Sequence, residues 1–196
     1  MEFKMQIGVL ALQGAFIEHI EMLTPLGVET VEVRLPKELK GLDGLIIPGG
    51  ESTTISKLAV NYDLMGPLNE FASRHPVWGT CAGMIFMAKE ADLDQPLLGL
   101  MNIIVKRNAF GRQVDSFKTD LTVSVINDGE RRPFPAVFIR APKLVAVKGK
   151  VKVIAELLDG TAVAAQEGKW LVTAFHPELT NDDRFHRYFL SLIGTK

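Results

Sequence analysis

Short apolar runs rich in Val, Ile and Leu recur through the first half of the chain and predict strands. The runs Gln6–Leu12 and Leu42–Pro48 are almost continuously apolar, which is typical of strands buried on both faces. Val28–Val33 instead alternates apolar and polar residues with a period of two, which indicates a half-exposed strand. Val77–Thr80 is a brief strand that runs directly into Cys81.

Segments with helical periodicity separate these strands. The expected helices are Gly14–Leu26, Ser52–Val60, Met65–Arg74 and Ala82–Ala88. In the first of them, Phe16, Ile17, Ile20 and Leu23 recur at helical spacing, and Gly27 is expected to end the helix. Strands that alternate with helices are typical of a parallel sheet covered on both faces.

The second half of the chain is richer in strands. The expected strands are Asn102–Lys106, Leu121–Ile126, Ala136–Ile139, Val151–Leu157, Ala162–Gln166 and Leu171–Phe175. Turn sequences such as Asp159-Gly160 separate them and indicate hairpins, and Asp182–Leu192 is expected to be the last helix. We therefore predict a three-layer α/β fold for one domain over residues 1–196, with a mixed, mostly parallel sheet and a small antiparallel appendage.

Composition narrows the possible functions. The chain has 196 residues, a formal net charge of −1 and no basic stripe, which argues against a dedicated nucleic-acid binder. The longest apolar run, Cys81 to Ala88, is far too short to span a membrane, and the first residues lack the features of a signal peptide, so we expect a cytoplasmic protein. A single cysteine and four histidines without ligand spacing exclude a disulfide within the chain and a multi-cysteine zinc site, and no cofactor is expected.

The single cysteine lies in a sequence suited to nucleophilic catalysis. Gly79-Thr80-Cys81-Ala82-Gly83 joins a predicted strand to a predicted helix, as in the nucleophile elbow. The glycines permit a sharp turn, and the helix N-terminus favours the thiolate. The Ala82 backbone N–H is suitably placed to stabilise an oxyanion. An inert buried cysteine remains the alternative interpretation.

A base for this thiol is expected in Phe175-His176-Pro177-Glu178. In an extended segment the side chains of His176 and Glu178 project to one side, so the carboxylate can orient the imidazole. Pro177 is expected to keep His176 extended. His19 and His186 lie beside charged residues in predicted helices and are interpreted as solvent-exposed. The alternative is a surface turn in which His176 and Glu178 are neighbours by chance.

A third candidate segment is Pro48-Gly49-Gly50-Glu51-Ser52-Thr53-Thr54, which lacks the Gly-Lys-Ser/Thr ending of a nucleotide loop. The N–H groups of the diglycine Gly49-Gly50 can supply a second oxyanion donor, and Glu51 can hold an ammonium group. The alternative is a tight turn with Ser52 or Thr53 as the helix N-cap.

Taken together, PGGEST, GTCAG and FHPEL resemble the motifs of class I, triad-type glutamine amidotransferases. GVLALQGAFIEH (Gly8–His19), RNAFGRQVDSF (Arg107–Phe117) and VFIRAP (Val137–Pro142) narrow the resemblance to the glutaminase subunits of pyridoxal 5′-phosphate synthase. These motifs span most of the chain.

The resemblance implies hydrolysis of L-glutamine to L-glutamate and ammonia through a thioester on Cys81, with His176 moving protons and Glu178 orienting it. It implies an oxyanion hole formed by Gly50 and Ala82. Residues implied to bind glutamine are Gly50, Glu51, Ser52, Arg107, Ile139 and Arg140. It also implies a synthase partner, a (β/α)₈ barrel that receives the ammonia in a large hetero-oligomer, and Gln13 is a candidate for the signal between the two subunits.

Two alternatives stay open at the level of sequence. One is a γ-glutamyl hydrolase or an amidotransferase of another pathway, which would need a different sequence in place of RNAFGRQVDSF and VFIRAP. The other is a non-catalytic regulatory domain of the same fold. Such domains typically lose the cysteine or the histidine, whereas Cys81, His176 and Glu178 are all present here.

Overall fold

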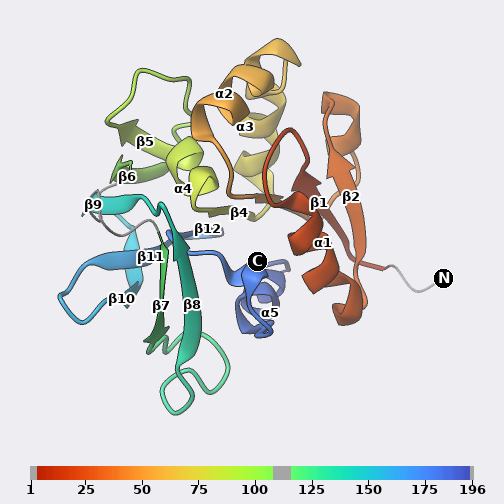
Figure 1. The fold of residues 1–196 in the computed structure, drawn as a ribbon. Coiled ribbons are helices and arrows are strands. Elements are labelled where there is room, and N and C mark those ends of the chain that lie inside the picture. Colours follow the sequence, from red (N-terminus) through yellow and green to blue (C-terminus); the bar gives the residue numbers. More distant parts are fainter. Residues whose placement is uncertain (1–3, 108–115, 195–196) are drawn as a thin grey trace.

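A seven-stranded sheet forms the centre of the molecule in a computed structural model that describes residues 4–107 and 116–194 (Figure 1). The strand order is β10-β11-β12-β4-β3-β1-β2. β12, β4, β3, β1 and β2 run parallel, whereas β10 and β11 are antiparallel additions at one edge. The sheet strands are β1 (Gln6–Leu10), β2 (Glu29–Val33), β3 (Gly44–Ile47), β4 (Val77–Thr80), β10 (Lys152–Glu156), β11 (Ala162–Glu167) and β12 (Trp170–Thr173).

Helices cover both faces of this sheet, as Figure 1 shows. The helices α2, α3 and α4 lie on one face, and α1 and α5 lie on the other. The α-helices are α1 (Phe16–Leu23), α2 (Ser52–Asn61), α3 (Met65–Arg74), α4 (Ala82–Met87) and α5 (Arg184–Ser191), and the short 3₁₀ turns are η1 (Thr24–Leu26), η2 (Pro36–Leu39) and η3 (Pro177–Leu179). The predicted three-layer α/β class is therefore confirmed.

Two small sheets make up the rest of the described fold. β5 (Ala88–Ala91), β6 (Met101–Lys106) and β9 (Lys143–Val147) form a three-stranded sheet, and β7 (Ser116–Leu121) pairs antiparallel with β8 (Phe134–Ile139). The predicted antiparallel hairpins are present in the second half of the chain, in the pairs β7–β8, β10–β11 and β11–β12. The short strand β5, the strand β7 before Leu121 and the strand β9 were not predicted, because charged and exposed residues interrupt their apolar patterns.

The predicted strand Leu121–Ile126 is wrong. β7 ends at Leu121, and the chain then makes successive turns in which Ile126 N–H donates to Val123 O and Gly129 N–H donates to Ile126 O. The side chains of Val123 and Ile126 are nevertheless buried, which explains the apolar alternation that imitated a strand.

The first helix is shorter than predicted. It ends at Leu23, and Pro25 lies within the 3₁₀ turn η1, which Gly27 terminates in a left-handed conformation with φ of 78°. Gly27 thus stops the segment as expected, because a glycine adopts positive φ without steric cost.

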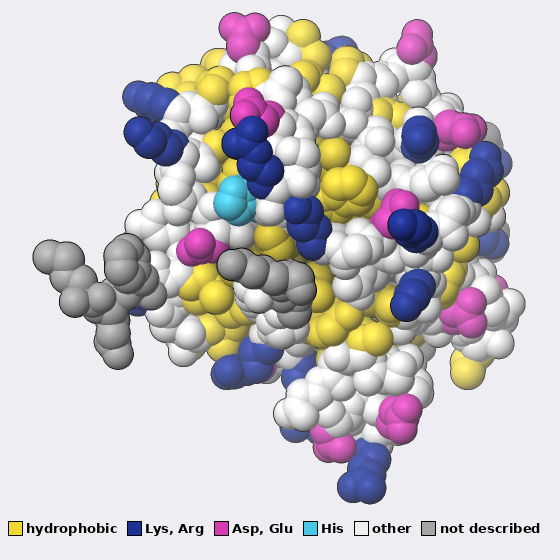
Figure 2. All heavy atoms as spheres, turned by 180° about the vertical axis from the view of Figure 1, so that it is seen from behind, with side chains coloured by type: hydrophobic (Ala, Val, Ile, Leu, Met, Phe, Trp, Pro, Cys, Tyr) yellow, Lys and Arg dark blue, Asp and Glu magenta, His cyan; other side chains and the backbone are white. Residues whose placement is uncertain are grey.

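The surface carries both signs of charge. On the face drawn in Figure 2, basic and acidic side chains are interspersed among apolar ones, in keeping with the near-neutral net charge. Within residues 4–107 and 116–194, no helix is both long enough and apolar enough to cross a membrane.

Candidate active site

Four parallel strands end at the same edge of the central sheet and bring four distant segments together there. Gln13 follows β1, Gly50 follows β3, Cys81 follows β4 and His176 follows β12. These four residues all line one cleft of about 340 Å³. The carboxyl edge of a parallel sheet is the usual location of sites in open α/β folds.

Cys81 occupies a strained turn between β4 and α4. Its φ is 48° and its ψ is −104°, a conformation that L-residues rarely adopt. The surrounding structure holds this conformation, since Cys81 N–H donates to Thr173 O at 2.8 Å and Met84 N–H donates to Cys81 O at 3.1 Å. The predicted elbow is therefore present in the backbone.

The glycines around Cys81 are required by close backbone packing. A Cβ atom on Gly83 would lie 2.0 Å from the carbonyl oxygen of Ile47, and one on Gly79 would lie 2.6 Å from Gly83. A Cβ on Gly49 would lie 2.4 Å from the His176 ring and 3.2 Å from Cys81 Cβ. The base and the nucleophile thus approach each other across a glycine backbone.

His176 and Glu178 form a buried pair beside Cys81. The distance from His176 Nδ1 to Glu178 Oε1 is 2.7 Å, and the two residues are 7% and 5% exposed. The reason given from sequence is wrong, however, because the segment is not extended. Pro177 begins the 3₁₀ turn η3, where a proline is favoured, and this turn brings the Glu178 side chain back onto the imidazole.

The electrostatics of the pair favour a protonated histidine. Burial by itself lowers the pKa of His176, but hydrogen bonds to Cys81 and Glu178, together with the charge on Glu178, raise it to about 10. Burial raises the pKa of Glu178, yet the facing His19 and His176 outweigh burial and hold it below its ordinary value. Cys81, His176 and Glu178 therefore have the arrangement of a nucleophile, a base and an orienting carboxylate.

Gln13 holds the glycine-rich loop that follows β3. Its Oε1 accepts a hydrogen bond from the Glu51 backbone N–H at 2.6 Å. A Cβ on Gly50 would lie 2.4 Å from the same Gln13 oxygen, so this contact also depends on a glycine. On the other side of the loop, Ala15 N–H donates to Gly49 O at 3.0 Å.

Glu51 is the N-cap of α2, in place of the Ser52 or Thr53 cap considered from sequence. Its carboxylate accepts hydrogen bonds from the backbone N–H of Thr54 at 2.8 Å and from the hydroxyls of Thr53 and Thr54. Hydrogen bonds from these threonines, led by the Thr53 hydroxyl, lower the pKa of Glu51 to about 2 although burial raises it.

Charged and polar side chains surround the opening of the cleft. Arg107 Nη1 lies 3.2 Å from Glu51 Oε1, and Arg140 lines the same cleft in a left-handed conformation with φ of 41°. Ile139 and Ser52 complete the predicted set, and Ile139 O lies 3.9 Å from Cys81 Sγ. The predicted oxyanion-hole and glutamine-binding residues thus line one cleft with Cys81 and His176, and Glu178 contacts His176. Of the motif RNAFGRQVDSF, residues 108–115 lie outside the described residues.

His19 and His186 are not solvent-exposed as predicted, since both are 0% exposed. Sequence periodicity could have shown this for His19, because position 19 lies on the same helical stripe as Phe16, Ile20 and Leu23. The charged Glu18 next to it led to the wrong expectation that His19 is solvent-exposed. His186 is buried between α5 and the sheet, where its ring packs edge-on against Trp78.

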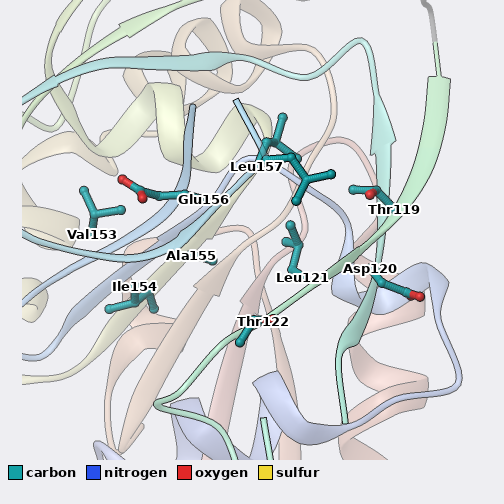
Figure 3. A pocket seen from close by; sticks show the side chains of 10 residues that line it. Thr119, Asp120, Leu121, Thr122, Val153, Ile154, Ala155, Glu156 and Leu157 are labelled. Atoms are coloured by element: carbon teal, nitrogen blue, oxygen red, sulfur yellow. The ribbon is translucent and has the colours of Figure 1, made fainter. Parts of the chain in front are cut away.

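A larger cleft of about 470 Å³ lies between β7 and β10. Figure 3 shows its walls, with Thr119 to Thr122 on one side and Val153 to Leu157 on the other. It contains no cysteine or histidine, so the candidate chemistry lies in the smaller cleft beside Cys81. In the described part of the chain, no group of three or more His, Cys, Asp or Glu residues is arranged to hold a metal ion.

Comparison with known proteins agrees with this geometry. Residues 9–194 match the SNO glutamine amidotransferase family. The chain is 58% identical to pyridoxal 5′-phosphate synthase subunit PdxT of Herpetosiphon aurantiacus, over 96% of this chain and 100% of that protein. It is 57% identical to the protein of the same name from Dehalococcoides mccartyi, over 96% of this chain and 97% of the relative.

Solved structures show the same similarity. A crystal structure of a glutamine amidotransferase, 48% identical, superposes with a TM-score of 0.90 over 96% of this chain and 99% of that one. The structure of PurLQS from Thermotoga maritima has a TM-score of 0.73, covering 96% of this chain and 99% of that one. At 15% identity, this second similarity concerns the fold alone.

Proposed function

Because the chain belongs to the SNO glutamine amidotransferase family, we propose that it uses Cys81, His176 and Glu178 to hydrolyse L-glutamine to L-glutamate and ammonia. It is the glutaminase subunit of pyridoxal 5′-phosphate synthase, since its family is one of glutamine amidotransferases and its relatives are named pyridoxal 5′-phosphate synthase subunit PdxT. The observation that carries the residue assignment is that Cys81 and His176 line one cleft at the carboxyl edge of the sheet while the buried Glu178 holds the His176 imidazole from 2.7 Å. We treat residues 1–196 as one catalytic domain, because Gln13, which follows β1, and His176, which follows β12, both line that cleft.

The first half of the reaction forms a thioester. The Cys81 thiolate attacks the side-chain carbonyl carbon of glutamine, and the carbonyl electron pair moves onto oxygen. The backbone N–H groups of Gly50 and Ala82 stabilise this oxyanion; Ala82, as the first residue of α4, has an N–H without a helical acceptor. The carbon–nitrogen bond then breaks, and His176 gives its proton to the departing nitrogen, which leaves as ammonia.

The second half releases glutamate. His176, now neutral, takes a proton from a water molecule while the water oxygen adds to the thioester carbon. Collapse of this intermediate expels the Cys81 thiolate and restores the imidazolium. Glu178 keeps the imidazole Nδ1–H oriented through its 2.7 Å contact in both halves.

The charges at the cleft opening suit a zwitterionic amino acid. Glu51 and Arg107 pair with each other at 3.2 Å and offer one charge of each sign. We assign Glu51 to the α-ammonium group and Arg107 with Arg140 to the α-carboxylate, because charge-assisted hydrogen bonds discriminate strongly. Ser52 and Ile139 complete the contacts with the bound glutamine.

The partner is the synthase subunit, a (β/α)₈ barrel in this proposal, and the two form a large hetero-oligomer in the cytoplasm. Ammonia passes directly to that subunit, where it is joined to ribose 5-phosphate and glyceraldehyde 3-phosphate. The product, pyridoxal 5′-phosphate, is formed by the partner, and this chain needs no cofactor of its own.

Gln13 is well suited to carry the signal from the partner. Its side chain supports the Glu51 N–H in the oxyanion loop, and the residues before it help to form a shallow cleft of about 320 Å³. Leu35 and Tyr62 line that cleft and are 38% and 46% exposed. A synthase subunit that covered these apolar side chains would press on the segment that carries Gln13 and could reorient the loop.

The test is glutamate release with and without the synthase subunit. A misoriented oxyanion donor costs about 10² to 10³ in rate, so the partner should raise kcat by a factor of that order. Gln13→Ala should reduce this activation more than it reduces binding of the partner. An isolated subunit that already works at full speed would contradict the coupling.

A further inference from the structure

A line of buried polar side chains continues behind the candidate triad. His19 Nε2 lies 3.4 Å from Glu178 Oε2, on the side of the carboxylate that faces away from His176. The same nitrogen lies 3.2 Å from Thr80 Oγ1, and His19 Nδ1 lies 3.0 Å from His186 Nε2. His19 comes from α1 and His186 from α5, so two helices on one face of the sheet supply this second layer.

Only one placement of the protons on His19 and His186 suits the polar atoms around these two rings. Glu178 Oε2 has no hydrogen-bond partner among the described residues, and a bare nitrogen of His19 would be repelled by it. The proton of His19 therefore sits on Nε2 and points toward Glu178 and Thr80. Nδ1 then accepts from His186 Nε2–H. His186 Nδ1 is left as a buried lone pair with no partner in the described part of the chain; the opposite arrangement would strand a buried N–H there.

Both histidines are neutral in this arrangement. Burial lowers the pKa of His19, and the nearby charge of His176 lowers it further against the opposing effects of Glu178 and Glu18. Burial and the neighbouring His19 lower the pKa of His186 well below its ordinary value. A neutral His19 turns the positive end of its N–H dipole toward Glu178 without adding a full charge, so Glu178 stays an anion for His176.

We propose that His19 is a positioning residue of the glutaminase reaction. Its Nε2–H donates to Thr80 Oγ1 and faces Glu178 Oε2 at 3.4 Å with its positive end, which keeps Oε1 on the Nδ1–H of His176, while His186 fixes the tautomer of His19. The inference rests on the proposed function, since it concerns the same triad.

Thr80 gives His19 a second connection to the site. Thr80 is the residue before the nucleophile, and its hydroxyl oxygen lies 3.2 Å from the same His19 nitrogen that faces Glu178 Oε2 at 3.4 Å. One imidazole thus contacts both the strand end that carries Cys81 and the turn that carries Glu178. Loss of this imidazole would free the Glu178 carboxylate to rotate and would remove the polar N–H that faces its buried Oε2.

The experiment compares His19→Leu with His19→Gln in the complex with the synthase subunit. Leucine keeps the bulk and removes the donor, whereas the glutamine amide carries an N–H close to the position of Nε2. His19→Leu should lower kcat by about 3- to 10-fold, the effect of losing a neutral hydrogen bond to Thr80 together with the N–H dipole that faces Glu178, with KM nearly unchanged. On the basic side of the pH profile, the activity of His19→Leu should fall at a lower pH than the activity of the wild type. His19→Gln should recover most of the wild-type rate.

A second readout does not depend on glutamine hydrolysis. An NMR titration of ¹⁵N-labelled histidine should give a lower pKa for His176 in His19→Leu than in the wild type. A wild type that releases no glutamate would overturn the proposed function, whereas an unchanged His176 titration would overturn the role of His19 alone. If His19→Leu does not fold, His19→Asn replaces it, because the shorter amide reaches His186 and not Glu178.

The matched control is Tyr188→Phe on α5, which removes a hydrogen bond from the tyrosine hydroxyl to Gln166 outside the line. It should lower stability in urea while leaving kcat and its pH profile unchanged. A folded His19→Leu with wild-type kcat and pH profile would refute the positioning role. A folded His19→Gln as impaired as His19→Leu would refute it as well, because the N–H would then not be what matters.

Discussion

Replacement of Glu178 by glutamine removes one charge from the buried pair and leaves its size unchanged. The carboxylate accepts a 2.7 Å hydrogen bond from His176 and helps to raise the pKa of that histidine to about 10. A hydrogen bond to a charged group contributes about 1.5 to 3 kcal/mol. At about 1.36 kcal/mol for each factor of ten, Glu178→Gln should lower kcat/KM by about 10- to 150-fold.

The direction of the pH effect follows from the same pair. Without the negative charge, burial dominates and the pKa of His176 falls, so the imidazolium loses its proton at lower pH. The basic limb of the kcat/KM profile should therefore move to lower pH in the variant. The assay is glutamate release by the complex from about pH 5 to pH 10, and Glu156→Gln is the control because Glu156 is an exposed carboxylate on β10. A profile with the same basic limb in Glu178→Gln and wild type would refute the reasoning.

Three further perturbations test other parts of the account. Cys81→Ala should abolish glutamate release yet still support cofactor synthesis when ammonium salt replaces glutamine; failure of ammonium to rescue synthesis would contradict ammonia transfer to the partner. Gly83→Ala should unfold or strongly destabilise the protein in urea, because its Cβ would lie 2.0 Å from Ile47 O, whereas Gly66→Ala in α3 has open space and should be neutral or stabilising by up to about 1 kcal/mol. His176 binds its proton more tightly when folded, so its contribution to stability should be complete below pH 6.5 and lost toward pH 10, and unfolding measured in urea should show a weaker loss over that range in His176→Asn.

The sequence predicted the architecture of the first half well, because β1, β3 and β4 are almost fully buried and the helices between the strands are amphipathic. β3 and β4 are buried at every position, so their apolar runs are unambiguous. The strand pattern failed where burial came from a turn, as at Val123 and Ile126. The strand β9 exposes most of its positions at least partly and left no clear period.

In the candidate site, the order of strands along the sequence was sufficient to predict which residues lie at the carboxyl edge of the sheet. The chemistry of Cys81 and His176 could be predicted because each follows a buried strand. Contacts between segments that are distant in the sequence could not be predicted in this way. Neither the 3.4 Å approach of His19 to Glu178 nor the capping role of Glu51 follows from local pattern, since each depends on how helices and loops pack on the finished sheet.

The most direct measurement of the central claim is covalent labelling of the single cysteine by a glutamine analogue that carries an electrophilic carbon in place of the side-chain amide. The account predicts that mass spectrometry will find the label on Cys81, that the synthase subunit will accelerate labelling, and that L-glutamine will protect against it. His176→Asn should be labelled much more slowly. A complex that hydrolyses glutamine at full rate while Cys81 remains unlabelled at saturating analogue would contradict the assignment of Cys81 as the nucleophile.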